Sequence, residues 1–119
     1  MALRNLILIA QNPAKTANFL VKTVGLVIKH ESAAMIELRD SRDILPIIVK
    51  SADGLSPSVL STGYSPVMTF DVPNMEASIT KAIELGAMLD GGIKYPVYGK
   101  FASIRSPEGF MIGLFEPAQ

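Results

Sequence analysis

The sequence predicts an α+β fold of two tandem βαβββ modules whose sheets form a curved, incompletely closed barrel. Two observations predict it. A short apolar strand followed by a capped helix occurs twice, because Asn5 and Asn12 in the first copy are matched by Val67 and Asn74, each 62 positions later. Two such periods nearly fill the 119 residues, and an internal repeat of this length constrains the fold strongly. We expect a single domain over residues 1–119.

The first module, about residues 1–50, is expected to hold one helix and four strands. Residues 5–10 are apolar and β-branched, so we expect a short strand buried on both faces. Asn12 and Pro13 are typical of a helix start, because the asparagine caps the first turn and a proline N–H is not needed there. Gly25 is typical of a helix end. The remaining strands are expected at residues 26–31, 34–39 and 44–50, with turns at residue 32 and residues 40–43.

The second module, about residues 66–119, repeats this order after a linker at about residues 51–65. The linker contains five serines, two glycines and one proline, which is typical of a surface connection. Asn74 again caps a helix and Gly86 ends it. Strands are expected at residues 67–72, 87–89, 101–105 and 111–115, with turns at residues 90–92 and 107–109.

The composition excludes several classes of function. The chain has no cysteine, which excludes a disulfide scaffold, a thiolate zinc site and a cysteine nucleophile. Eleven basic and eleven acidic residues give a formal charge of zero, so we expect neither nucleic acid nor a membrane as a partner. No apolar run approaches the roughly 20 residues that span a bilayer and no signal peptide is recognised, so a cytoplasmic protein is expected.

The low charge content bears on assembly. Charged residues make up 18% of the chain, whereas roughly 25% is usual in soluble domains. Apolar surface is therefore left to be covered, and the predicted sheets have open edges. Together these features predict a homodimer.

The closing stretch, residues 106–117 with the sequence SPEGFMIGLFEP, carries a family resemblance together with residues 6–25 and 67–86. In this order and at this period, the three stretches resemble the vicinal oxygen chelate superfamily, which includes glyoxalase I, bleomycin-resistance proteins and extradiol dioxygenases. The resemblance covers residues 5–117. It implies the paired-module fold, a homodimer and work on small molecules.

The resemblance also places the metal-ligand positions of this superfamily. They fall on Asn5, Val67 and Gly113, with the fourth within residues 44–52. Of the residues at these positions, only Asn5 can act as a metal ligand, and an amide is a weak one. A divalent ion needs several converging oxygen or imidazole ligands. We therefore expect a divergent member with no metal and no cofactor, and neither metal-dependent glyoxalase nor dioxygenase activity.

Alternation along the strands predicts which residues line the face that the helices leave open. This face is mostly apolar, which is typical of a pocket for a small molecule. Tyrosines in the linker and in the loop before the seventh strand suit the rim of such a pocket. The expected ligand-binding residues are Asn5, Ile7, Ile9, Tyr64, Val67, Thr69, Tyr95, Tyr98, Phe101, Met111, Gly113 and Phe115, with Asp71 on the same face. The core is expected to hold Leu6, Leu8, Phe70, Val72, Ile112 and Leu114.

The titratable residues carry weaker indications. His30, the only histidine, is expected to be a solvated residue near a strand end. Glu116 lies three positions after Gly113, so alternation turns it to the other face and predicts a surface carboxylate. Glu37 and Arg39 are expected to form a same-face surface pair that contributes little stability.

These observations favour a metal-free small-molecule binding protein of the glyoxalase/bleomycin-resistance type, with its ligand in an apolar concave cleft. A metal-independent glyoxalase-like lyase or isomerase, using Asn5, His30 or a tyrosine, is an alternative. A second alternative is a non-catalytic dimeric interaction protein whose concave face is covered by the partner subunit. The residues assign no catalytic role and name no ligand. They also leave open whether the modules pair within one chain or swap between subunits.

Overall fold

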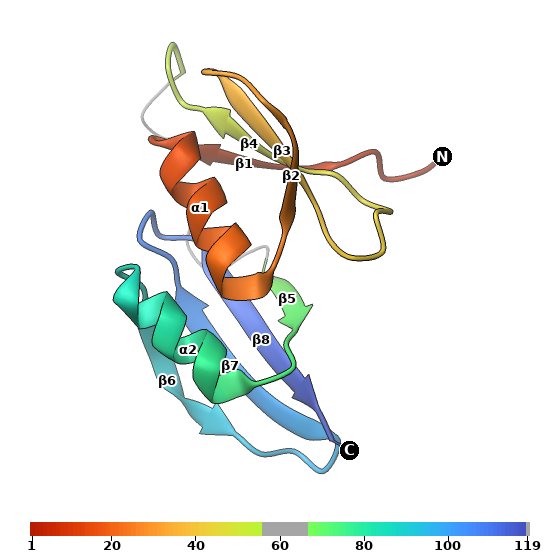
Figure 1. Cartoon of the computed structure of the whole chain (residues 1–119), viewed down its shortest axis with the longest axis vertical. Helices are drawn as coiled ribbons and strands as arrows, with labels where there is room; N and C mark the ends of the chain where they lie inside the picture. The colour runs from red at the N-terminus through yellow and green to blue at the C-terminus, as the bar shows by residue number, and fades with distance from the viewer. Residues whose placement is uncertain (56–66, 119) are drawn as a thin grey trace. The chain divides into compact units, whose positions relative to one another are not determined.

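Each half of the chain folds as one βαβββ module (Figure 1). The computed structural model describes residues 1–55 and 67–118. It divides into two compact units, Met1–Ser61 and Thr62–Gln119, which we call the first and second modules. Among the described residues, each holds one helix and one four-stranded sheet, and neither sheet closes on itself. The predicted α+β class and the repeated βαβββ module are confirmed.

The first module is a mixed sheet with one helix packed against it. Its strands follow the order β1-β4-β3-β2; β1 pairs with β4 in parallel, and the other pairs are antiparallel. Leu20 of the helix is fully buried, as are Leu38 and Val49 of the sheet, and these residues form the core. The elements are β1 (Leu6–Ala10), α1 (Pro13–Val24), β2 (Val27–Glu31), β3 (Met35–Arg39) and β4 (Ile47–Ser51).

The second module repeats this topology. Its strands follow the order β5-β8-β7-β6. As in the first module, the strand that comes first along the chain, β5, pairs in parallel with the strand that comes last, β8. Met75 of the helix is fully buried, and the sheet contributes Ile104 and Leu114, which are equally buried. The elements are β5 (Met68–Asp71), α2 (Met75–Glu84), β6 (Met88–Lys94), β7 (Gly99–Arg105) and β8 (Met111–Pro117).

The two helices begin with the same cap. Asn12 Oδ1 accepts a hydrogen bond from the Lys15 N–H at 3.2 Å, and Asn74 Oδ1 accepts one from the Ala77 N–H at 3.0 Å. Each bond gives an acceptor to a backbone N–H of the first turn, and the Lys15 N–H also reaches the Asn12 carbonyl at 3.1 Å. Gly25 ends α1 in the left-handed conformation at φ 76°, as its position predicted.

The predicted core is confirmed for Ile112 and Leu114 on the inner strand β8 and for Val72 just after the edge strand β5, and it is wrong for the other three residues. Val72, Ile112 and Leu114 are buried, whereas Leu6, Leu8 and Phe70 are only half-buried. The strand at residues 5–10 is not buried on both faces either, because 52% of the Ile7 side chain is exposed. The reason is topological, since β1 and β5 lie at the edges of their sheets and have one neighbouring strand each.

The predicted turn at residues 90–92 is wrong, because these residues lie inside β6. The pairing register with β7 shifts between Asp90 and Lys94, which is a bulge rather than a reversal of the chain. Gly91 adopts φ 80°, a conformation that glycine reaches without steric cost. The reversal comes later, at residues 95–98.

Glu116 corrects a second prediction, since it is not a free surface carboxylate. Its Oε1 accepts a hydrogen bond from the Met75 N–H at 2.6 Å, at the first residue of α2. Lys100 Nζ lies 3.0 Å from Glu76 Oε1 and 3.8 Å from the second oxygen of Glu116. β8 and β7 thereby hold the start of α2 through charge-assisted contacts.

The caps generate the first prediction. Asn12→Ala and Asn74→Ala should each lower the free energy of unfolding by about 1 kcal/mol, because each removes the side-chain acceptor that caps the first turn. Urea unfolding followed by circular dichroism measures this loss. Asn18→Ala, at an exposed position within α1, is the matched control and should be neutral or slightly stabilising, since alanine is the better helix former. Equal losses in all three variants would contradict the capping role.

The Lys100–Glu76 pair generates a pH prediction. Their hydrogen bond holds the pKa of Glu76 below its ordinary value and raises the pKa of Lys100. The lowered pKa of Glu76 stabilises the fold above the unfolded glutamate pKa of about 4.3, and this is lost as the pH falls through the native pKa. The raised pKa of Lys100 stabilises the fold below the unfolded lysine pKa of about 10.4, and this is lost as the pH rises through the native pKa.

Lys100→Gln should therefore raise the pKa of Glu76 and remove a stability difference that is largest between about pH 5 and pH 10. A carboxyl NMR titration measures the pKa, and unfolding at several pH values measures the stability. Lys81→Gln, which breaks an exposed pair with Glu84 at 3.3 Å on the same helix, is the control and should leave the Glu76 titration unchanged. An unchanged Glu76 titration in Lys100→Gln would contradict the assignment.

Candidate functional site

The face of the second sheet that points away from α2 gathers most of the predicted ligand-binding residues. Gly113 of β8 is paired with Thr69 of β5 on one side and Ser103 of β7 on the other. One step along β8, Phe115 is paired with Phe101 of β7. Directly paired residues share a face, so hydroxyl and aromatic side chains alternate along this surface.

Two of these side chains close over Gly113. A Cβ atom added to Gly113 would lie 2.6 Å from Thr69 Oγ1 and 3.2 Å from the ring of Phe101. The space that the missing side chain leaves is thus occupied by its neighbours rather than open for a ligand. Glycine at this position lets the Phe101 ring and the Thr69 hydroxyl approach the same point of the sheet.

A second close approach fixes the other ring. A Cβ on Gly99 would lie 2.9 Å from the ring of Phe115, which therefore packs directly on the backbone at the start of β7. Phe115 also meets Tyr98, with ring centroids 5.7 Å apart and planes inclined by 35°. We call Thr69, Tyr98, Phe101 and Phe115 the aromatic platform. It joins three rings to one hydroxyl; Thr69, Phe101 and Phe115 lie on strands, and Tyr98 lies in the loop before β7.

The other predicted ligand-binding residues of this module differ in how exposed they are. Met111 lies on the platform's face of β8 and is buried, whereas Val67 is 44% exposed. Tyr95 is 69% exposed in the loop between β6 and β7. Tyr64 lies outside the described residues.

The open face of the first sheet carries Asn5 and Ile9, which are half-buried, and the exposed Ile7. Ile7 pairs with Ile48, as Thr69 pairs with Gly113 in the second module. Ile48 therefore occupies in β4 the place that Gly113 has in β8. Ile48 also pairs with Glu37, and Ile9 pairs with Lys50, so this face carries charged side chains beside its apolar ones.

Glu37 and Arg39 are more tightly held than a surface pair. Arg39 Nη2 and Nε donate to Glu37 Oε2 at 2.7 and 3.0 Å, and Nη1 donates to Asp43 Oδ1 at 3.0 Å. The hydrogen bond to Glu37 is the main reason that the pKa of Arg39 is raised. Asp43 adopts φ 58°, which is unusual for a residue other than glycine, and the arginine contacts this turn through the Asp43 carboxylate.

His30 is exposed, as predicted, and lies opposite Glu37 across the β2–β3 pair. Sequence reasoning could not find this carboxylate, because it depends on the strand register after a bulge between Ile28 and His30. The Glu37 oxygen that Arg39 binds is already engaged, and no described contact orients the imidazole. The catalytic alternative that uses His30 stays a prediction.

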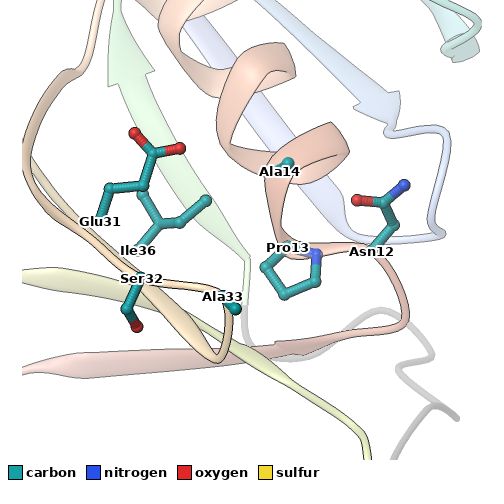
Figure 2. Close-up of a pocket in the computed structure, with 7 residues that line it drawn as sticks. All are labelled: Asn12, Pro13, Ala14, Glu31, Ser32, Ala33 and Ile36. Carbon is teal, nitrogen blue, oxygen red and sulfur yellow. The ribbon is translucent and has the colours of Figure 1, made fainter.

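A hollow of about 380 Å³ in the first module was not anticipated from the sequence. Figure 2 shows Pro13 and Ala14, at the start of α1, on one side and Ile36 and Glu31 on the other. The helix start and the β2–β3 turn are each recognisable in the sequence, but their proximity is a tertiary feature. The lining also includes the polar residues Asn12 and Ser32, but Glu31 is the one carboxylate among the lining residues, so the hollow offers no pair of groups for acid–base chemistry.

The residues at the positions that the family resemblance assigns to metal ligands do not fit a divalent ion. They hold Asn5, Val67 and Gly113, and the register adds Ile48 as the counterpart of Gly113. One amide among side chains without donor atoms is not a donor set for a divalent cation. Across residues 1–55 and 67–118, no group of three or more His, Asp or Glu side chains lies close enough to hold an ion.

In the described part of the chain, no helix is both long enough and apolar enough to span a membrane.

No family model matches the sequence, and no curated protein matches it significantly. Solved structures do match over essentially the whole chain. A glyoxalase family protein from Bacillus cereus aligns with a TM-score of 0.86 at 15% identity, covering 100% of this chain and 95% of its own. A glyoxalase/bleomycin resistance protein/dioxygenase family enzyme from Burkholderia phytofirmans PsJN gives 0.79 at 18% identity, covering 99% and 100%.

A genomically encoded fosfomycin resistance protein from Listeria monocytogenes is also similar, with a TM-score of 0.74 at 14% identity over 99% of this chain and 94% of that protein. Identities this low establish the fold and not the activity. The chain has the fold of the glyoxalase/bleomycin-resistance structures, which is the fold that the family resemblance implied.

Proposed function

We propose that this chain is a small-molecule binding protein that needs no metal, and that its ligand lies on the aromatic platform of the second module. The observation that carries the proposal is the meeting of the Phe101 ring and the Thr69 hydroxyl over Gly113. An apolar surface with a few fixed polar groups is the usual form of a small-molecule site.

The fold supports this class of function. Structures with this fold include proteins described as bleomycin-resistance and fosfomycin-resistance proteins, so the architecture is compatible with binding small molecules. The donor set at the metal positions gives no support for metal chemistry in this chain. Binding by apolar and aromatic contact is what the remaining side chains can supply.

Each platform residue has a distinct role in the proposal. Phe101 and Phe115 offer ring surfaces for a flat apolar ligand, and Tyr98 extends this surface from the loop. Thr69 supplies a hydroxyl that can donate or accept a hydrogen bond. The predicted contributions of Val67 and Met111, of Asn5, Ile7 and Ile9 in the first module, and of Tyr64 and Tyr95, stay predictions.

We also propose that the chain forms a homodimer, since the edge strands and exposed apolar side chains such as Val27 and Met88 leave surface to cover. Native mass spectrometry of tag-free protein should show twice the chain mass, and a monomer at all concentrations would contradict the proposal. The same spectrum reports any bound small molecule or metal. The cytoplasmic location stays a prediction.

The platform generates a binding prediction. Benzyl alcohol, a neutral aromatic probe, should shift the backbone amide NMR signals of Thr69, Phe101, Gly113 and Phe115. Phe115→Leu keeps an apolar side chain but removes the ring, and Tyr98→Ala removes an exposed ring. Each should weaken binding by about 2- to 12-fold, because an aromatic pair contributes about 0.5–1.5 kcal/mol beyond its buried area.

Val97→Ala is the matched control for the loop. Val97 is fully exposed and lies next to Tyr98, so this substitution should leave the affinity unchanged. Shifts confined to other surfaces, or no saturable shift at any concentration, would refute the platform as a ligand site.

A further inference from the structure

A single cross-strand row on the platform's face carries both charge and rings. Lys94 of β6 is paired with Phe101, Phe101 with Phe115, and Phe115 with Asp71 of β5. These four side chains therefore lie on one face in one line across the whole sheet. Three interstrand spacings of about 4.8 Å separate the ends of the row, or about 14 Å.

The charges at the two ends are exposed, and no described residue forms an ion pair with them. Within the described residues, neither Lys94 nor Asp71 makes an ion pair or a side-chain hydrogen bond. By contrast, Lys81 and Lys100 of the same module are both ion-paired with glutamates. The row thus holds an ammonium and a carboxylate that no residue of 1–55 or 67–118 neutralises, with two phenyl rings between them.

The neighbouring row adds polar groups but does not neutralise the charges of Lys94 and Asp71. It runs from Asp90 through Ser103 and Gly113 to Thr69. Asp90 is separated from Lys94 by the bulge in β6, and the two do not form an ion pair. The hydroxyls of Ser103 and Thr69 lie beside the rings, where they can bind either end of a polar ligand.

We propose that the platform selects planar aromatic ligands that carry an anionic group at one end and a cationic group at the other. The anionic group faces Lys94, the ring lies on Phe101 and Phe115, and the cationic group faces Asp71. The lysine side chain is long enough to bend over its neighbouring ring, so the ligand can be shorter than the row. This inference rests on the proposed binding function and specifies its ligand class.

Solvent limits what each charge contributes. An exposed ion pair typically contributes about 0.2–1 kcal/mol, which corresponds to about 1.5- to 5-fold in affinity. Rings supply most of the affinity, and the charges set the orientation of the ligand. Because exposed pairs are screened by salt, the selectivity should fall as the ionic strength rises.

Four probes that share one ring test the proposal. They are 4-(aminomethyl)benzoate with both charges, benzoate with the anion, benzylamine with the cation, and benzyl alcohol with neither. Affinities come from NMR titrations at low ionic strength. We expect 4-(aminomethyl)benzoate to bind more tightly than either singly charged probe, and about 2- to 25-fold more tightly than benzyl alcohol.

Two substitutions separate the ends of the row. Lys94→Gln should weaken benzoate about 1.5- to 5-fold and leave benzylamine unchanged or slightly tighter, whereas Asp71→Asn should do the reverse. Lys29→Gln and Asp53→Asn make the same changes in net charge at exposed positions of the first module, and they should alter neither probe. Equal responses to both substitutions at the row, or the same responses in the controls, would overturn the proposed orientation.

The outcomes distinguish the two proposals. If benzyl alcohol binds the platform and 4-(aminomethyl)benzoate binds no better, the ligand class is wrong and the binding function stands. If none of the four probes shifts the platform signals, the binding function fails and the ligand class fails with it.

Discussion

The parallel pairing of the first and last strands is the constraint on which each module depends. Leu6 opposes Ile47 in one module and Met68 opposes Ile112 in the other, so each pair joins residues more than 40 positions apart. Parallel neighbours cannot be joined by a tight turn, and here the chain passes through a helix and two strands before it returns. The helix covers one face of the sheet and leaves the other face uncovered.

The sequence was informative wherever the determinant is local. Asn12 and Asn74 cap helices at matched positions, and Gly25 ends the first helix as its conformational freedom predicts. Glu116 was misjudged because its partner, the Met75 backbone, lies 41 positions away. The Gly91–Gly92 pair predicts a turn, because an aspartate followed by two glycines fits the sequence of a bulge as well as that of a chain reversal. Only the pairing register distinguishes them.

The candidate site shows the same division. Alternation placed Thr69, Gly113 and Phe115 on one face, and the strand pairing bears this out. It could not show that Phe101 and Thr69 occupy the space above Gly113, since that depends on how residues of three strands pack. A missing side chain therefore does not by itself indicate a cavity. In this sheet it permits close packing, which fixes an aromatic surface in place.

The bulges in the two antiparallel edge strands have a consequence for solubility. β2 is interrupted between Ile28 and His30, and β6 between Asp90 and Lys94, so neither presents a regular ladder of hydrogen-bonding groups. Irregular edges of this kind are a known protection against strand-by-strand aggregation. β1 and β5 keep an unbroken register, so any strand added from another molecule finds its template at those edges. Fibrillar growth, which needs two usable edges on each sheet, is blocked at one of them.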